Sequence, residues 1–136
     1  MALQVSDAVR NAMIDAFETA VGATAVLKIY DLTAGAPANT SAAIAATVLV
    51  SMTLPADWMD AAASGSKSKL GTWSATGTAA GTADFFRIFA ADGTTCHAQG
   101  TVTATGGGGV MTLDNPIIVS GQPVTISTFT LTGSNP

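Results

Sequence analysis

Charged side chains are scarce in this sequence of 136 residues, since only 10% of them are Asp, Glu, Lys or Arg, against about 25% in an average soluble domain. Lys and Arg number 5 and Asp and Glu number 9, which gives a net charge of −4. Without a basic surface the chain cannot displace counterions from phosphates, so nucleic acid is not an expected partner. An anionic membrane surface is disfavoured for the same reason. Partners must therefore be bound through shape and apolar contact.

Cysteine and long hydrophobic runs are also nearly absent. The single cysteine, Cys96, excludes an internal disulfide, which is typical of a protein made in the cytoplasm. Mean hydropathy is high at +0.43, but the longest aliphatic stretch, residues 44–50, is interrupted by Thr47 and is far shorter than the roughly 20 residues of a spanning helix. The first residues lack the charged and apolar regions of a signal peptide. We therefore expect cytoplasmic synthesis and no membrane partner.

The residues that usually carry enzyme chemistry are few. The only histidine, His97, follows Cys96, but consecutive side chains of a strand point to opposite faces, so the two are not expected to share a proton. One His and one Cys cannot supply the about four ligands of a zinc site. Residues 64–68 resemble a phosphate-binding loop, yet Ser66 replaces the glycine required before Lys67, so we expect a solvated loop there. We assign no catalytic, cofactor-binding or metal-binding residue and expect no enzyme activity.

Residues 5–21 show the three-and-four spacing of an amphipathic helix. Ser6 is its expected N-cap and Gly22 its expected stop. Arg10, Asp15 and Glu18 are expected on the solvated side. The opposite, apolar face is expected to pack against the rest of the protein and contains Val5, Ala8, Val9, Ala12, Met13, Phe17 and Val21.

The remainder of the chain consists of short β-rich runs separated by turn residues, such as Asp92-Gly93, which predicts a hairpin. Aspartates near strand ends are expected to cap backbone amides. Seven or eight strands at a spacing of roughly 8–12 residues favour a β-sandwich or a barrel. We expect a mainly β fold: a single antiparallel, jelly-roll-like β-sandwich with one N-terminal α-helix, forming one domain over residues 1–136. The expected strands cover residues 25–31, 45–54, 70–76, 83–90, 95–103, 110–113, 116–120 and 122–132.

Two tryptophans and a methionine are the best candidates for contact residues, because such side chains are enriched at interface cores. Trp73 lies within an expected strand, and we favour a place in the core for it. Trp58 and Met59 follow Pro55 in an expected connection, where a core position and a protein interface are equally supported. Trp58 and Met59 are therefore the candidate protein-interface residues.

Several segments resemble a group of small tailed-phage and prophage virion proteins. Residues 3–12 resemble the group's "SDAxRNAxxDA" opening, and residues 27–31 its "LKIYD" strand. The likeness continues at residues 86–89 and 92–94, ends at residues 118–122 and 124–132 with the "IVSGQxVxIxSFTxT" ending, and is weakest over residues 55–80. These residues belong to expected strands and turns and carry no chemistry. The resemblance implies a virion structural protein without any assigned binding residue.

The leading hypothesis is a capsid cement, or decoration, protein on the outer surface of a phage head. Its partners would be the major capsid protein and copies of itself, as a dimer or trimer, and many modest contacts would add up by avidity. A tail, baseplate or fibre-associated protein on the same fold is the alternative. A carbohydrate-binding module that uses Trp58 or Trp73 as a stacking platform is a third reading. An enzyme that depends on His97 is the weakest.

Overall fold

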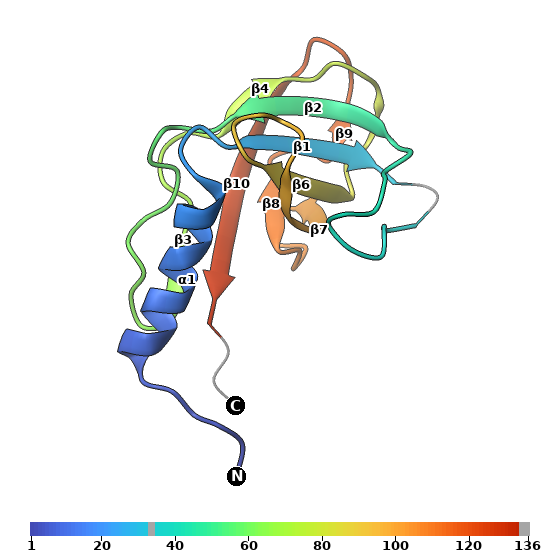
Figure 1. The fold of residues 1–136 in the computed structure, drawn as a ribbon. Helices are drawn as coiled ribbons and strands as arrows, with labels where there is room; N and C mark the ends of the chain where they lie inside the picture. Colours follow the sequence, from blue (N-terminus) through green and yellow to red (C-terminus); the bar gives the residue numbers. More distant parts are fainter. Residues whose placement is uncertain (33–34, 134–136) are drawn as a thin grey trace.

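The N-terminal helix forms where the sequence predicts it. In the computed structural model, which describes residues 1–32 and 35–133, α1 covers Asp7–Val21. The Ser6 hydroxyl accepts a hydrogen bond from the Val9 amide at 3.4 Å, and Gly22, at φ 89°, ends the helix by donating its N–H to the Glu18 carbonyl. Both predicted caps are thus confirmed. In Figure 1, the first turn of α1 lies at the end of the molecule where the N-terminus lies.

Most of the predicted strands are present, within a few residues of their expected limits. The described strands are β1 (Val26–Asp31), β2 (Thr47–Thr53), β3 (Ser66–Ser68), β4 (Ser74–Thr76), β5 (Gly81–Thr82), β6 (Phe85–Phe89), β7 (Cys96–Ala104), β8 (Met111–Leu113), β9 (Ile117–Ile118) and β10 (Pro123–Thr132). Strands β5 and β3 were not expected. The hairpin between β6 and β7 is confirmed: Gly93 has a φ of 70°, and Asp92 Oδ1 accepts hydrogen bonds from the amides of Thr94 and Thr95 at 2.8 and 2.9 Å.

The strands form one eight-stranded sheet and one two-stranded sheet. In the larger sheet the order is β2-β1-β6-β7-β8-β10-β3, with β4 also paired to β10, and the smaller sheet contains β5 and β9. The pairing is antiparallel except between β7 and β8, where residues 102–104 lie parallel to residues 111–113. The expectation of a purely antiparallel fold is therefore wrong. The chain leaves β7 through the glycine run 106–109 and returns to lie beside the same strand in the same direction, so β8 does not continue the hairpin pattern.

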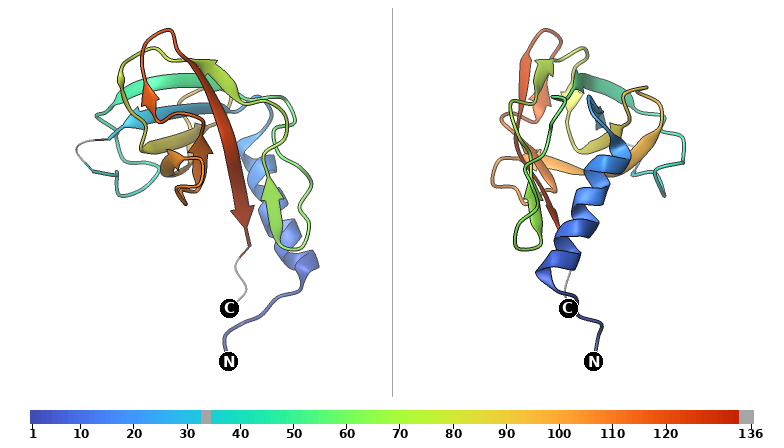
Figure 2. Two further views of the ribbon diagram at one scale, coloured as in Figure 1. Left: turned by 180° about the vertical axis from the view of Figure 1, so that it is seen from behind. Right: turned by 60° about the vertical axis from the view of Figure 1, so that its left-hand side comes forward.

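The larger sheet curls until its two ends approach each other (Figures 1 and 2). Just after β4, the Thr78 amide donates to the Leu49 carbonyl in β2 at 2.7 Å. Phe86 of β6 and Phe129 of β10 meet edge to face at 5.8 Å across the enclosed space. The interior is therefore filled from both halves of one mixed sheet, and α1 lies along β3 at one end.

A polar network attaches the loop before β2 to the outside of the sheet. Arg87 of β6 is 4% exposed and donates to the carbonyls of Asn39 and Ala42 at 3.1 and 2.8 Å and to the Gln99 side chain. Gln99 in turn donates to the Pro37 carbonyl at 3.0 Å. These bonds satisfy the buried guanidinium and fix the loop, which explains why an arginine is tolerated in an otherwise apolar strand. Within the described residues, no helix has both the length and the apolar character needed to cross a bilayer.

Candidate functional site

Trp58 and Met59, the residues predicted as interface candidates, lie in the protein's own core. Their exposed fractions are 0% and 2%. The Trp58 indole donates to the Gly22 carbonyl at 3.0 Å, just beyond the C-terminus of α1. The interface assignment is therefore wrong: both side chains are used internally and present no surface to a partner. The Trp58 side chain thus holds the C-terminal end of α1 against the core.

A continuous row of aromatic rings connects the helix to the centre of the sheet. Phe17 contacts Trp58 with ring centroids 5.9 Å apart, Trp58 contacts Trp73 at 5.8 Å, and Trp73 contacts Phe129 at 5.5 Å. Trp73 is 1% exposed, as predicted for a core residue. Since neither tryptophan ring reaches the surface, neither offers a stacking platform for a sugar ring.

The polar side of α1 is turned toward the protein, although the Asp15 side chain remains 48% exposed. Side chains of the helix meet the backbone of residues 59–65, a segment whose strand pairing consists of two isolated bridges, Met59–Lys69 and Ala63–Ser66. Asn11 accepts from the Gly65 amide at 2.8 Å, Asp15 from the Ala62 amide at 3.2 Å, and Glu18 from the Met59 amide at 3.2 Å. The three acceptors are spaced by one helical turn and the three amides by three residues. The helix therefore provides the hydrogen-bond acceptors that a neighbouring strand would otherwise supply.

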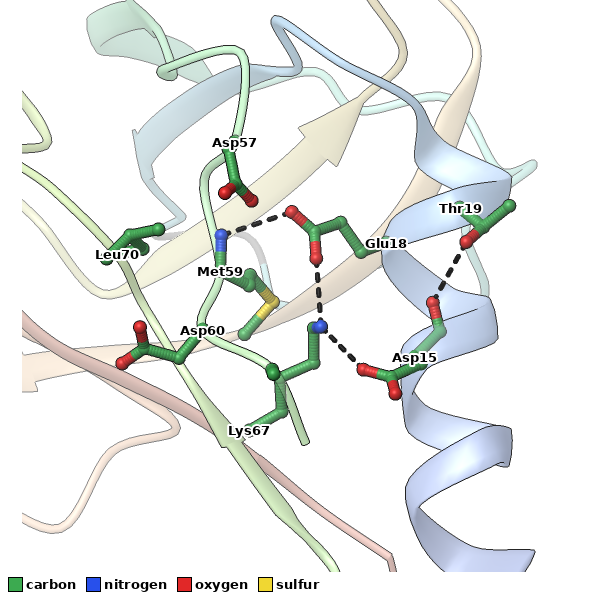
Figure 3. A pocket seen from close by; sticks show the side chains of 9 residues that line it. Asp15, Glu18, Thr19, Asp57, Met59, Asp60, Lys67 and Leu70 are labelled. Carbon is green, nitrogen blue, oxygen red and sulfur yellow. Dashed lines mark hydrogen bonds and ion pairs between the residues drawn. The ribbon is translucent and has the colours of Figure 1, made fainter. Parts of the chain in front are cut away.

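Lys67 completes this contact from β3 (Figure 3). Its amine lies 2.7 Å from Asp15 Oδ1 and 2.9 Å from Glu18 Oε2, and its side chain is 4% exposed. Burial opposes the charge of Lys67, but the two carboxylates outweigh burial and raise the pKa of the amine above 10.5. The hydrogen bond from Lys67 lowers the pKa of Asp15 below 3.8. The expected solvated loop over residues 64–68 is thus wrong for Lys67, whose ion pairs hold β3 against α1.

A polar hollow of about 470 Å³ lies beside these ion pairs, with Asp57 and Asp60 on its lining as well (Figure 3). The ionisable groups Asp15, Glu18 and Lys67 on its lining already form ion pairs with one another, which limits the reactions that the hollow could support. The two carboxylates favour the protonated form of Lys67, which is therefore no free nucleophile, and the lowered pKa of Asp15 makes it a poor proton donor. Among the described residues, no three His, Cys, Asp or Glu side chains gather closely enough to hold a metal ion. The hollow is best understood as part of the structural contact between α1 and β3.

The Cys96–His97 pair lies at the start of β7, where the two side chains differ in burial. Cys96 is partly buried and its thiol donates to the Ala98 carbonyl at 3.4 Å, whereas His97 is exposed. Burial raises the pKa of the Cys96 thiol, which is opposite to the lowered pKa that activates a nucleophilic cysteine. The geometry gives this pair no shared proton.

The outward side of α1 is uncharged and, apart from Thr19, apolar, which is largely the reverse of the predicted orientation. Phe17 and Val21 do face the core and Val5 is half-buried, but Ala8, Val9, Ala12 and Met13 are exposed. Val9 and Met13 are 46% and 65% exposed. We call the exposed residues of this side the outer helix face: Ala8, Val9, Ala12, Met13, Ala16 and Ala20. Asn11, Asp15 and Glu18 instead accept hydrogen bonds from backbone amides of residues 59–65.

An apolar groove adjoins the outer helix face near the N-terminus. It has a volume of about 390 Å³ and lies between α1 and the extended arm formed by residues 1–6. Its lining consists of Leu3 and Val5 of the arm, Arg10, Met13 and Ile14 of the helix, and Gly133. Leu3 itself is 82% exposed. A second exposed apolar group, Ile117 and Val119 at 64% and 51%, lies in and beside β9 and is called the β9 patch.

Comparison of the chain with protein-family models, with curated proteins and with solved structures finds no match.

Proposed function

We propose that the chain is a structural protein of a tailed-phage virion, and specifically a cement protein that stabilises the head by bridging neighbouring major capsid subunits. The observation that carries this proposal is the exposure of apolar side chains at two separate places, the outer helix face and the β9 patch. In Figures 1 and 2 these belong to elements at different ends of the molecule. Bridging requires at least two contact surfaces, and exposed apolar groups on separate elements are typical of contact sites.

The low charge of the chain supports the same proposal. With only 10% charged residues, long-range electrostatic attraction is weak, and contacts must be made by shape and burial of apolar area. Each contact made by a small apolar patch is modest, but the repeated symmetry of a capsid multiplies it, since a bound protein stabilises the assembled state by mass action. The proposed place of the protein is the outer surface of the head, after synthesis in the host cytoplasm.

A jelly-roll-like sandwich is the fold that we propose for this role. The halves would be β2-β1-β6-β7 on one side and β8-β10 with β3 and β4 on the other. The contact between Phe86 of the first half and Phe129 of the second supports two layers facing each other. The parallel pair β7–β8 distinguishes this arrangement from a regular antiparallel jelly roll.

Particles assembled with and without the protein test the proposal. We expect particles that carry the protein to resist heat and chaotrope better, and electron microscopy to show its density on the head. Variants with Ile117→Asp should bind shells more weakly, because an unpaired carboxylate would be buried in the contact. Equal resistance of the two kinds of particle would contradict a cement role. Density on the tail or baseplate would instead favour the alternative of a tail, baseplate or fibre-associated protein.

A further inference from the structure

We infer that α1 is a releasable cover over the open edge of the larger sheet, and that it leaves this edge as one unit while the core stays folded. We call residues 59–65, the backbone that α1 covers, the edge segment. Three features support such a release: the place of the edge segment in the sheet, the polar character of its contact with α1, and the small share of α1 in the core. The release does not depend on the proposed function.

The edge segment lies where the larger sheet ends. Strand β3 is the last strand of the sheet on this side, and residues 59–63 lie beyond it. The amides of Asp60 and Ala63 donate to carbonyls of β3 at 2.8 and 2.9 Å. The neighbouring amides of Met59 and Ala62 donate to α1 instead. The helix therefore occupies the side on which a further strand would pair, and a helix in this position keeps a sheet edge from pairing with another chain.

The contact between α1 and the edge segment is polar (Figure 3). Three acceptor side chains of the helix bind amides of the edge segment, and the Arg10 guanidinium donates to the Ser64 carbonyl at 2.8 Å. Two of the acceptors, Asp15 and Glu18, also form the ion pairs with Lys67. Asp15 is 48% exposed, so water reaches this contact. Water takes over hydrogen bonds when such groups separate, so the net cost of separating them is small.

The share of α1 in the hydrophobic core is small. Of its 15 residues Val21 is the buried one, and Phe17 packs partly against the core. Both lie toward the C-terminal end of the helix, where the Trp58 indole binds the Gly22 carbonyl. Segments with few buried apolar contacts open at a lower free energy than the whole protein. Release of α1 therefore leaves most of the core intact, and Gly22, at φ 89°, is the point about which the helix turns.

Hydrogen exchange of single backbone amides, followed by NMR on the whole protein, tests the release. We expect the amides of Met59, Ala62 and Gly65 to share one degree of protection, because α1 covers all three. Their exchange should be at least about tenfold faster than that of the Leu54 and Ile126 amides, which donate to carbonyls of buried residues. Equal protection of the two groups would show that α1 leaves only when the whole protein unfolds, which would overturn the inference.

The amides of Asp60 and Ala63 are an internal control. They belong to the same segment but donate to β3 and not to α1. If α1 is the part that leaves, these two amides should exchange more slowly than those of Met59 and Ala62. Equal exchange at all four would assign the opening to the separation of the edge segment from β3, and a release of α1 would be excluded.

Asn11→Ala tests whether the helix leaves as one unit. The Asn11 side chain accepts from the Gly65 amide alone among the three, and alanine is the best helix former, so the variant should keep α1 helical. Loss of one hydrogen bond should speed exchange about two- to tenfold, and a concerted release spreads this increase to Ala62 and Met59. An increase confined to Gly65 would contradict a concerted release.

Lys67→Met tests the ion pairs of the contact, with Lys69→Met as the matched control. Lys67 pairs with two carboxylates of α1, whereas the Lys69 amine donates to the nearby Gly71 carbonyl. Lys67→Met should speed exchange across the edge segment, and Lys69→Met should leave it unchanged. Unchanged exchange at the core amides of Leu54 and Ile126 checks that both variants are folded. The same exchange in the two variants would remove the ion pairs from the device and overturn the inference.

Discussion

Removal of the Trp58 side chain should destabilise the protein more than almost any other single truncation. Trp58 is fully buried, contacts Phe17 and Trp73, and donates its indole N–H to the Gly22 carbonyl. Truncation of a buried tryptophan to alanine costs about 3–5 kcal/mol through lost burial and the remaining cavity. The free energy of unfolding of a small domain is only about 5–15 kcal/mol. We therefore expect Trp58→Ala to lose a large part of the free energy of unfolding measured in urea.

Trp58→Phe separates the ring from its hydrogen bond. Phenylalanine keeps an aromatic ring between Phe17 and Trp73 but removes the hydrogen bond to the half-buried Gly22 carbonyl, which costs about 0.5–1.5 kcal/mol. The control is Ile117→Ala, at a side chain that is 64% exposed, and its effect should stay within about 0.5 kcal/mol. If Trp58→Ala were as mild as the control, Trp58 would not be a core residue and the interface interpretation would return.

The contact between α1 and β3 and the β6–β7 turn give three further predictions. Lys67→Met should lower the thermal midpoint more than Lys69→Met, since it leaves two carboxylates without their buried cation whereas Lys69 hydrogen-bonds only a nearby carbonyl; equal midpoints would contradict the ion pairs. The pKa of Asp15 is lowered below 3.8 and that of Lys67 is raised above 10.5. The ion pair should therefore contribute its full stability between these pH values, and the contribution should be lost as the pH falls through the lowered pKa of Asp15 or rises through the raised pKa of Lys67. Urea unfolding at different pH measures this dependence, which Lys67→Met should abolish. Hydrogen bonds from Thr95 and Thr94 lower the pKa of Asp92 to about 2. The carboxyl resonance of Asp92 should therefore titrate with a midpoint near that pH, and Thr95→Val should raise the midpoint. A midpoint at 3.8 in the wild type would contradict these hydrogen bonds.

The sequence predicts most of the secondary structure because the patterns are local. The alternation in residues 123–132 and the Asp92-Gly93 turn each depend on neighbouring residues, and both are present as β10 and the β6–β7 hairpin. The helix and both caps were likewise predictable from residues 6–22. Strand β3 was not, because Ser66-Lys67-Ser68 has no apolar alternation and becomes a strand only by pairing with residues 130–132 of β10.

The orientation of α1 could not be predicted from its own residues. The apolar stripe that includes Val9 and Met13 is the usual sign of a buried face, and Asp15 and Glu18 the usual sign of a solvated one. In the structure, the amides of Met59, Ala62 and Gly65 donate to the polar side chains of the helix, and β3 supplies Lys67. A partial signal exists in the sequence, since a lysine in a segment otherwise poor in charge is a candidate partner for two acids one turn apart on a helix. Lys67 lies 52 residues after Asp15 in the sequence, so local sequence patterns do not reveal their pairing.

The inverted helix is also what links the fold to the proposed role. If α1 were oriented as its pattern suggests, its apolar residues would be buried in the core and its acidic residues would face solvent. Since Lys67 and the backbone of residues 59–65 take up the polar side, Val9 and Met13 remain available to another molecule. Surface that is apolar, uncharged and rigidly supported suits a subunit of an assembly.

Oxidation of individual methionines tests the inverted helix most directly, because thioether oxidation follows solvent exposure. Met13 is 65% exposed, whereas Met52 and Met59 are 2% and Met111 is 0% exposed. In dilute, folded protein treated with mild peroxide, peptide mass spectrometry should find Met13 oxidised rapidly and the other three protected. Protection of Met13 in the dilute monomer, or oxidation of Met59 at the same rate, would contradict the account.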